Sequence, residues 1–433
     1  MFEISGKYTT ARVMIDDVEE ECIAQIRTFV NHPAFTNPVA IMPDTHAGKG
    51  SVIGFTMPLG DKVIPNTIGV DVGCGITAVN IGDIDIDYAT LDRSVRKAVP
   101  VGFNVHGHAV VNLKHGFDWK LVNEIGYRFR DRFAATYDTT IEPVKYTYEW
   151  FEKLCTFVRA EPDAVRAAVG TLGGGNHFIE VAEGEQGEKW VVVHSGSRNF
   201  GLRVAEAYQR LALKTVGKHR EREYQDRLDA IRTTCERNRI GAEIKKMRDE
   251  LGLGIPKDLA YLEGQQAHDY YHAMIFAQQY AALNRDTMIA RILATIPDAM
   301  VVDRIESVHN FIDFDDLIIR KGAIRSHQDD RLIVPFNMRD GSLIGVGKGN
   351  VDWNCSAPHG AGRIMSRSVA KRTLSVEEYR DQMQGIYTTS VGRETLDEAP
   401  GAYKDAQTII DAIAPSVEIV DRIRPVYNLK AST

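Results

Sequence analysis

The chain has 433 residues, with 59 acidic and 52 basic side chains and a formal net charge of −7 when histidine is neutral. Hydrophobic residues make up 44% and charged residues 26% of it, which excludes a disordered, collagen-like or disulfide-scaffold protein. The mild negative charge argues against nucleic-acid binding by bulk electrostatics, although a local basic groove would not show in this sum. Because no linker-like stretch divides the chain, we expect one large domain over residues 1–433.

Cysteine usage and hydropathy bear on the cellular compartment. The five cysteines are an odd number without a CxxC pair, which argues against a disulfide framework or a zinc ribbon. No run approaches the roughly 20 apolar residues of a membrane helix, and the first residues lack the basic and apolar regions of a signal peptide. We therefore expect a cytoplasmic protein without a membrane partner.

The first 80 residues predict strands separated by glycine turns, at ARVMI (11–15), PVAIMP (38–43) and VIPNTIGVDVG (63–73). From about residue 141 to 169 the spacing of apolar residues predicts an amphipathic helix, which GTLGGGNHF (170–178) interrupts. KWVVV (189–193) is then a strand that ends at His194 in a polar turn.

Residues 204–300 are predicted to be mainly helical, and up to about residue 251 they are very rich in charge. Such a charge run is typical of helices projecting into solvent, and a contribution to holding a long polyanion is the alternative. Strands follow at RLIVPF (331–336) and SLIGVG (342–347), and residues 417–430 form a closing strand or strand pair.

Six short segments combine possible metal ligands with glycines or polar residues, and all lie at predicted strand ends or turns, where a rigid scaffold can direct side chains into one cleft. They are MPDTHAGKG (42–50), GVDVGCG (69–75), GGGNHFIE (173–180), VVVHSGSR (191–198), SVHNF (307–311) and SAPHGAGR (356–363).

In GVDVGCG, Asp71 and Cys74 are three residues apart on a glycine-rich turn, so a carboxylate and a thiolate can face one point. A shell of thiolate, carboxylate and imidazole suits Mn²⁺, Zn²⁺, Fe²⁺ or Co²⁺ better than Ca²⁺ or Mg²⁺. The same two residues also fit a capping aspartate and a small buried thiol, and their spacing leaves both interpretations open.

His177 follows three glycines whose backbone N–H groups could approach a phosphate, and Glu180 arrives with it. His194 stands where a buried strand ends, with Arg198 four residues on. In one interpretation the imidazoles bind a metal and the guanidinium group of Arg198 binds a phosphate. In the other, the glycines form a flexible turn and the histidine is buried for structural reasons.

In SAPHGAGR, Pro358 and Gly360 flank His359, and Arg363 and Arg367 follow at four-residue intervals. A histidine beside guanidinium groups is what covalent phosphoryl or nucleotidyl transfer needs, and a helix cap with structural arginines is the alternative. The K-x-D-G lysine motif of common nucleotidyl-transferring ligases is absent, so histidine is the candidate acceptor.

In this order, the motifs PDxHxGKG, GVDxGCG, GxGNHFxE, HSGSR, HN, RKGA (320–323), HGAGR and EAPxAYKD (398–405) resemble those of the RtcB family of RNA ligases, from Pro43 to Lys430. The resemblance implies that family's own mixed α/β (α+β) fold, a single domain with mixed sheets around a metal and nucleotide cleft and here a charged helical insertion. It also implies GTP- and Mn²⁺-dependent joining of RNA 3′-phosphate or 2′,3′-cyclic phosphate ends to 5′-hydroxyl ends, through a guanylylated histidine and an RNA-(3′)pp(5′)G intermediate.

Carried onto this sequence, the resemblance implies roles for single residues. His359 would be guanylylated, and two Mn²⁺ ions would be held, with Cys74 bridging, by Asp71, Cys74, His177, His194 and His309. The nucleotide would be bound by Asn176, Phe178, Glu180, Ser342, His359, Gly360, Arg363, Tyr403 and Lys430. Phosphates of RNA or nucleotide would meet Arg198, Lys321, Arg363 and Arg367. Asp44 and His46 match a motif without an assigned role beyond support of the site.

One segment departs from the family pattern. Residues 335–342 replace a GSMG-like turn, so that Ser342 can still reach the base but Arg339 is expected to add charge to the pocket. Cys355, four residues before His359, is interpreted as packing rather than as a ligand.

Two other classes of function compete with the ligase. The same metal site could serve a Mn²⁺-dependent phosphoesterase acting on RNA ends, or the chain could be a non-enzymatic RNA-binding paralogue. His359 flanked by arginines favours the ligase, because a hydrolase needs no nucleophilic imidazole outside its metal shell. The physiological RNA, in tRNA splicing or in repair, and an accessory activator protein are not specified by the sequence.

Overall fold

The computed structural model describes residues 1–237, 239–252 and 255–431. One half of the fold is a six-stranded sheet. Its order is β1-β2-β3-β4-β12-β11, and β2 and β3 run parallel while the other pairs are antiparallel. Helix α1 (Glu20–Val30) makes the crossover between β2 and β3. The strands are β1 (Phe2–Ser5), β2 (Thr10–Val13), β3 (Val39–His46), β4 (Ile53–Pro58), β11 (Asn310–Asp313) and β12 (Ile318–Lys321).

The second half is a seven-stranded antiparallel sheet with the order β10-β6-β8-β7-β17-β15-β14. Its two edges approach each other, since the backbone N–H of Ile333 in β14 donates to Oγ of Ser307 in β10. The sheet therefore curls around its own apolar residues. The strands are β6 (Gly75–Asn80), β7 (Phe178–Glu183), β8 (Lys189–Ser195), β10 (Asp303–Val308), β14 (Arg331–Asn337), β15 (Gly341–Gly347) and β17 (Val417–Lys430).

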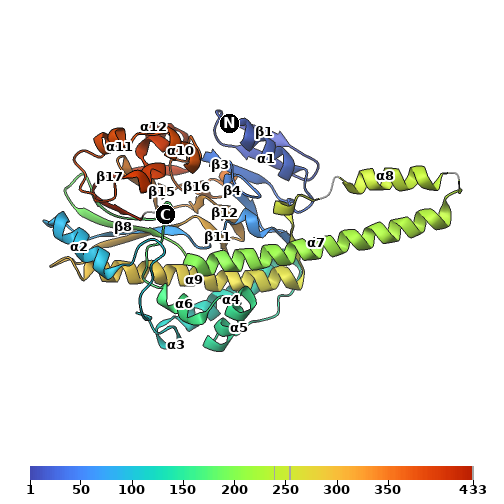
Figure 1. Cartoon of the computed structure of the whole chain (residues 1–433), viewed down its shortest axis with the longest axis horizontal. Helices are drawn as coiled ribbons and strands as arrows, with labels where there is room; N and C mark the ends of the chain where they lie inside the picture. Colours follow the sequence, from blue (N-terminus) through green and yellow to red (C-terminus); the bar gives the residue numbers. More distant parts are fainter. Residues whose placement is uncertain (238, 253–254, 432–433) are drawn as a thin grey trace.

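Two long helices, α7 (Arg198–Thr234) and α9 (Gln265–Leu293), run side by side under both sheets, as Figure 1 shows. An aromatic core joins α9 to the six-stranded sheet through Phe55, Phe129 and Phe276, and a second core joins it to β6 and β8. The remaining helices on this side are α2 (Tyr88–Ala98), α3 (Leu113–Gly116), α4 (Trp119–Tyr137), α5 (Tyr148–Val158) and α6 (Pro162–Ala167).

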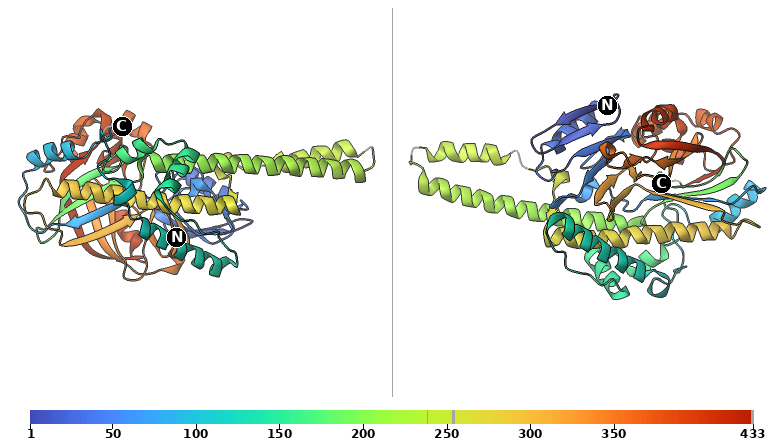
Figure 2. Two further views of the ribbon diagram at one scale, coloured as in Figure 1. Left: turned by 90° about the horizontal axis from the view of Figure 1, so that it is seen from below. Right: turned by 180° about the vertical axis from the view of Figure 1, so that it is seen from behind.

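The charged segment forms an arm, which consists of the distal part of α7 and of α8 (Ile240–Gly252). Beyond the body of the molecule α7 continues, and α8 returns beside it, so the two helices project together (Figures 1 and 2). Leu228 and Met247 are buried there, while most other described side chains are exposed. The prediction of charged helices projecting into solvent is confirmed.

The C-terminal part lies over the seven-stranded sheet and carries short helices and a two-stranded sheet. The helices are α10 (Arg367–Thr373), α11 (Val376–Gln382), α12 (Ala406–Ile413) and the 3₁₀ turns η3 (Val351–Trp353), η4 (Arg393–Glu398) and η5 (Pro400–Ala402). The small sheets pair β13 (Ala323–Arg325) with β16 (Ser356–Pro358), and β5 (Lys62–Val63) with β9 (Leu262–Glu263); the other 3₁₀ turns are η1 (Pro65–Thr67) and η2 (Lys257–Leu259).

The mixed α/β class is confirmed, and two local predictions are corrected. Residues 63–73 are not a strand: they contain β5, η1 and a turn, because Pro65 lacks a donor and Gly69 adopts a φ of +101°. The helix predicted from residue 141 begins at Tyr148, after Pro143 and a Thr147 cap, and ends at Arg159 in the left-handed region. For the C-terminal segment the single-strand alternative is confirmed, as β17, and helix α1 was not predicted.

Within the part of the chain that the structure describes, no helix is both long and apolar enough to cross a bilayer.

Candidate active site

Four of the predicted ligand residues lie where strands of the curled sheet begin or end. Cys74 immediately precedes β6, His177 precedes β7, His194 is the last residue but one of β8, and His309 connects β10 to β11. The antiparallel register aligns these ends, because Gly75 pairs with both Ser195 and Val308. The sheet therefore brings residues from distant parts of the sequence to one edge.

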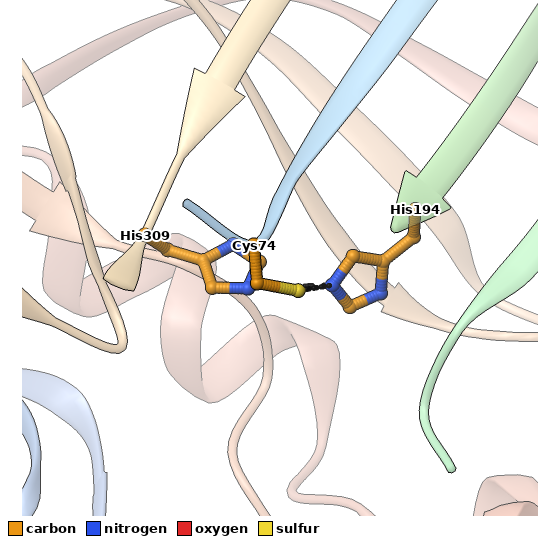
Figure 3. A group of neighbouring side chains, drawn as sticks. All are labelled: Cys74, His194 and His309. Carbon is orange, nitrogen blue, oxygen red and sulfur yellow. Dashed lines mark hydrogen bonds between the residues drawn. The ribbon is translucent and has the colours of Figure 1, made fainter. Parts of the chain in front are cut away.

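The ligand atoms of these side chains lie close together. Sγ of Cys74 is 3.2 Å from Nε2 of His194 and 3.4 Å from Nε2 of His177, and Nε2 of His194 is 3.3 Å from Nε2 of His309. Oδ2 of Asp71 is 2.8 Å from Nε2 of His177. Two groups result, Cys74–His194–His309 and Asp71–Cys74–His177, and Cys74 is common to both. Figure 3 shows the Cys74 sulfur directed toward the ring of His194, with His309 on its other side.

Backbone carbonyls orient two of the imidazoles. Nδ1 of His177 donates to the carbonyl of Leu172 over 2.8 Å, and Nδ1 of His194 donates to that of Asn176 over 3.1 Å. Because a carbonyl accepts, each Nδ1 carries a proton, and Nε2 of His194 directs a lone pair at Cys74, while Nε2 of His177 faces both Cys74 and the Asp71 carboxylate. This orientation is the one that ligating histidines adopt, so the residues fit a divalent metal.

Burial and neighbouring positive groups disfavour protonation of two histidines in this cluster. Burial, followed by the nearby positive groups, holds the pKa of His194 and of His309 well below the usual range. Burial also raises the pKa of Cys74. Burial favours the protonated form of Asp71, but the hydrogen bond and the charge of His177 outweigh it and lower its pKa. Oδ1 of Asp71 is buried without a hydrogen-bond partner among the described residues. Neutral imidazoles beside an unpartnered carboxylate oxygen favour a cation.

A buried polar pair on α9 supports the turns that carry these residues. Asn284 accepts the N–H groups of Gly170 and Thr171 and donates to the carbonyl of Gly196 over 3.0 Å. Arg285 donates to the carbonyls of Gly73 and Ser195 and pairs with Glu306. The sequence prediction missed both residues. Other polar residues also occur along α9, such as Gln278, Gln279 and Asp286, so no sequence signal singled out these two.

His359 follows β16 and is oriented by Asp44. Its Nδ1 donates to Oδ2 of Asp44 over 2.6 Å, and its backbone N–H donates to the same oxygen over 3.2 Å. The register of β3 against β4 shifts between Ile41 and His46, and this irregularity contains Asp44. With Nδ1 engaged, Nε2 of His359 carries the free lone pair. The His359 and His309 rings have centroids 4.8 Å apart, so the two imidazoles lie side by side.

A cavity of about 290 Å³ opens beside His359 and extends to β7 and β17. In the sheet register Glu180 pairs with Asn428 and Phe178 with Lys430, so these four residues form one wall. Asn428 donates to Oε2 of Glu180 over 2.8 Å, and burial raises the pKa of Glu180 to about 8. Three buried polar atoms of this wall lack a partner in the described residues: Glu180 Oε1, Asn428 Oδ1 and Ser342 Oγ. Such atoms require hydrogen bonds from a ligand or from water.

Next to this wall, and including its Lys430, one side of the cavity is positively charged around a buried carboxylate. Glu398 receives Lys430 Nζ and the Tyr403 hydroxyl, both over 2.6 Å, and lies 3.2 Å from Arg363 and 3.6 Å from Arg367. Burial favours the protonated form of Glu398, yet the charges of Lys430 and Arg367 lower its pKa. Three cations around one carboxylate leave an excess of positive charge suited to phosphate. Glu398 stood in a quoted motif, but no role was predicted for it.

The structure brings most of the predicted site residues to this cavity, including Asn176, Gly360 and Arg363. Lys321 is different: it is buried and donates to the carbonyls of Lys49 and Ser51, and it is not among the described residues that line this cavity. Burial lowers its pKa to about 7. A phosphate contact by Lys321 therefore has no geometric support.

Two further expectations meet different outcomes. Arg339 pairs with Asp340 over 2.8 Å and does not line the cavity among the described residues, so the expectation that it adds charge there is wrong. Asn337 and Met338 line the cavity instead. Cys355 faces the carbonyl of Gly349 and belongs to neither ligand group of the described chain, in agreement with its interpretation as packing.

Comparison with known proteins gives the same assignment as the motifs. A family model described as tRNA-splicing ligase RtcB matches residues 25–431. The chain is 30% identical to the RNA-splicing ligase RtcB of Escherichia coli (strain K12), with 95% of each chain covered. It is 25% identical to the tRNA-splicing ligase RtcB of Archaeoglobus fulgidus, covering 98% of this chain and 93% of that one. The similarity spans both sheets and every motif segment, and the chain therefore belongs to the RtcB family.

Proposed function

We propose that this protein is an RNA ligase that joins an RNA end bearing a 3′-phosphate or 2′,3′-cyclic phosphate to a 5′-hydroxyl end, using GTP and Mn²⁺. Membership of the RtcB family supports the ligase class, since relatives across nearly the full length are named RNA-splicing or tRNA-splicing ligases. The proposal includes a cytoplasmic location, and the choice between tRNA splicing and RNA repair depends on the RNA that the cell presents.

The observation that carries the proposal is the position of His359. Asp44 holds its Nδ1 proton, so Nε2 is free to attack, and the ring lies between the ligand groups and the positively charged side of the cavity. A neutral imidazole with one fixed tautomer is a competent nucleophile toward the α-phosphorus of GTP. The bond from Nε2 to phosphorus forms as pyrophosphate departs.

The same position explains the two steps that follow. The RNA 3′-phosphate takes the guanylyl group from His359, and the resulting anhydride supplies the leaving group that a phosphate monoester lacks. Attack by the 5′-hydroxyl on the RNA phosphorus then releases GMP. Arg363 and Arg367 lie where negative charge develops on the phosphates, which is where fixed cations stabilise a transition state.

Two metal positions are assigned to the ligand groups. Cys74, His194 and His309 would hold one Mn²⁺, and Asp71, Cys74 and His177 the other, with the Cys74 thiolate shared. The soft thiolate and the imidazoles favour Mn²⁺ over Mg²⁺. When bound, such ions neutralise phosphate oxygens at the attacking and leaving positions.

Guanine recognition is assigned to the wall formed by β7 and β17. The unpartnered Oε1 of Glu180 can accept from the donor edge of guanine, Ser342 and Lys430 can donate to its acceptors, and Phe178 and Tyr403 supply apolar contact. Asn176 and Gly360 lie near the sugar and phosphate side of the cavity.

The test is transfer of the α-phosphate of labelled GTP to the protein. With Mn²⁺, we expect wild-type protein to carry label that survives denaturation and is labile to acid, and we expect His359→Ala to carry none. His115→Ala, which alters an exposed histidine on α3, is the matched control and should label normally. Absence of label in the wild type with any divalent metal contradicts the ligase mechanism. Release of phosphate from RNA ends without joining would then favour the phosphoesterase.

A further inference from the structure

The proposed function assigns no role to the motif RKGA (320–323), whose segment joins β12 to β13. The N–H groups of Gly322 and Ala323 donate to the carbonyl of His309 over 2.6 and 3.3 Å. Gly322 also lies against the ring of His359, since a Cβ added to Gly322 would be 3.2 Å from Cε1 of that ring. The motif therefore contacts a candidate metal ligand and the candidate nucleophile together.

Arg320, the first residue of the motif, is fully buried, and two carboxylates of the same hairpin neutralise its charge. Its Nη1 donates to Oδ2 of Asp313 over 3.1 Å, and its Nη2 donates to Oδ2 of Asp316 over 2.7 Å. A guanidinium group has five N–H donors, so these two bonds leave others available. The remaining donors reach a part of the chain more than 30 residues away.

That part of the chain is the turn before β16. Nε of Arg320 donates to Oγ of Ser356 over 2.8 Å, and Nη2 donates to the carbonyls of Cys355 and Asn354 over 3.1 and 3.4 Å. These bonds join β12 to β16, which Figure 1 labels near the centre of the body. The position of the turn therefore depends on the side chain of Arg320.

Two consecutive residues of this turn have left-handed backbone conformations. Asn354 has a φ of +49° and Cys355 a φ of +44°, and neither is glycine. A residue with a Cβ adopts this region at a cost in free energy, and it persists there only where the surrounding structure enforces it. Arg320 binds the carbonyls of both residues, and the N–H of Ser326 adds a bond to that of Cys355. The guanidinium group thus stabilises a strained turn.

The strand β16 connects this turn to His359. It has only three residues, Ser356–Pro358, and His359 follows directly. The backbone N–H and Nδ1 of His359 both donate to Oδ2 of Asp44, so both bonds depend on where β16 lies. A shift of the turn would therefore displace the nucleophile from the carboxylate that orients it.

We propose that Arg320 is a positioning residue of the ligase, which places His359 for attack on GTP by holding the left-handed turn at Asn354 and Cys355. This inference rests on the proposed function. Arg320 lines neither the nucleotide cavity nor the neighbouring cavity of about 410 Å³ in the described chain, so it acts through β16 and not by contact with a substrate. A displacement of about 1 Å can lower a rate about 100-fold. Loss of these bonds should therefore slow guanylylation more than it weakens GTP binding.

The experiment measures the rate at which GTP labels His359 in the full chain, with Mn²⁺ and over a range of GTP concentrations. Arg320→Lys keeps the charge but loses the fork of donors. We expect its rate at saturating GTP to fall about ten-fold or more, and its half-saturating GTP concentration to change less than about three-fold. Arg325→Lys is the matched control, because Arg325 also pairs with Asp313 but its side chain binds no atom of the turn among the described residues. It should label at the wild-type rate.

A second substitution tests the role of the turn itself. Glycine adopts a positive φ without the conflict that a Cβ creates, so Cys355→Gly makes the left-handed turn easier to form. Added to Arg320→Lys, it should raise the rate of labelling about three-fold or more, and alone it should leave the wild-type rate unchanged. If the double variant is as slow as Arg320→Lys, Arg320 does not act through the turn, and the inference is overturned.

The other outcomes are equally decisive. If Arg320→Lys labels at the wild-type rate, or if only its half-saturating GTP concentration changes, the inference is wrong and the proposed function stands. If a melting curve shows that Arg320→Lys does not fold, Ser356→Ala decides, because it removes the acceptor of Arg320 Nε. We expect it to slow labelling about three-fold or more, and an unchanged rate would overturn the inference. If wild type carries no label with any divalent metal, the proposed function fails and this inference fails with it.

Discussion

Cys74 is the residue on which both candidate metal positions depend. Its sulfur is the ligand atom common to the two groups, and burial, followed by the charge of Asp71, raises its pKa. Without a cation the group is a buried thiol next to two imidazole lone pairs. With cations it would become a thiolate that balances positive charge on both sides, because metal coordination deprotonates a thiol. Each position has only three protein ligands, so removal of the shared one leaves two.

We expect Cys74→Ala to lose both Mn²⁺ ions, because two protein ligands rarely retain a first-row transition-metal ion when the protein is diluted. The metal content of the protein after desalting, measured together with its melting temperature, checks this. Cys355→Ala removes a thiol outside the ligand groups of the described chain and should retain the wild-type content. Unchanged Mn²⁺ in a folded Cys74→Ala protein would refute the assignment of both positions.

At the scale of elements, the site is predictable where it lies in turns and hidden where it lies in a helix. His194 was visible in the sequence because it stands with polar neighbours at the end of an apolar run, and His309 was assigned through the resemblance that its HN motif carries. Asn284 and Arg285 were not, because α9 has no turn, glycine or ligand cluster to mark them. Strand pairing supplied the rest: the alignment of Glu180 with Asn428 follows from a register that single strands cannot specify.

We expect the arm to be dispensable for the folding of the body. The two points where it leaves and rejoins the body are adjacent, since Thr215 is bonded to Gln266 over 3.0 Å and His219 lies 3.7 Å from Glu263. Replacing residues 221–256 by a short Gly-Ser linker should therefore change the melting temperature by less than about 3 °C, the shift expected for roughly 1 kcal/mol.

The shortened chain should also keep GTP-dependent labelling of His359, because no arm residue lines either cavity in the described chain. Ala212→Asp, which buries an unpaired charge where α7 packs on the body, should lower the melting temperature far more. A fall of 10 °C in the shortened chain would show that the arm supports the fold. The RNA affinity of the shortened chain, compared with that of wild type, tests the alternative that the charged arm helps to bind the RNA.

For the molecule as a whole, the same curled sheet that buries its apolar residues also places charged groups out of water. Its class was predictable from alternating apolar patterns and glycine turns, whereas the meeting of β10 and β14 was not, because sheet closure depends on long-range pairing. Closure leaves Glu180 fully enclosed, and burial raises its pKa from 4.5 to about 8. The burial of this carboxyl group therefore makes global stability depend on pH.

The pH dependence of unfolding follows from this shift. Between pH 4.5 and about 8 the folded, ligand-free protein retains a proton on Glu180 that the unfolded chain releases, so this group makes stability fall as pH rises through that window. At about 1.4 kcal/mol for each pKa unit, the upper limit is about 5 kcal/mol. Glu180→Gln cannot ionise, and its free energy of unfolding should therefore exceed that of wild type at pH 8 but not at pH 4.5.

Denaturant melts of both proteins across this range, without metal or GTP, measure the difference. Glu183→Gln on the same strand alters a glutamate whose side chain is 45% exposed, and its difference from wild type should stay nearly constant with pH. A constant difference for Glu180→Gln as well would mean that Glu180 is already ionised in the folded protein. In that case the guanine edge assigned to Glu180 would meet an acceptor that is already ionised, with no proton to be released from this carboxyl group.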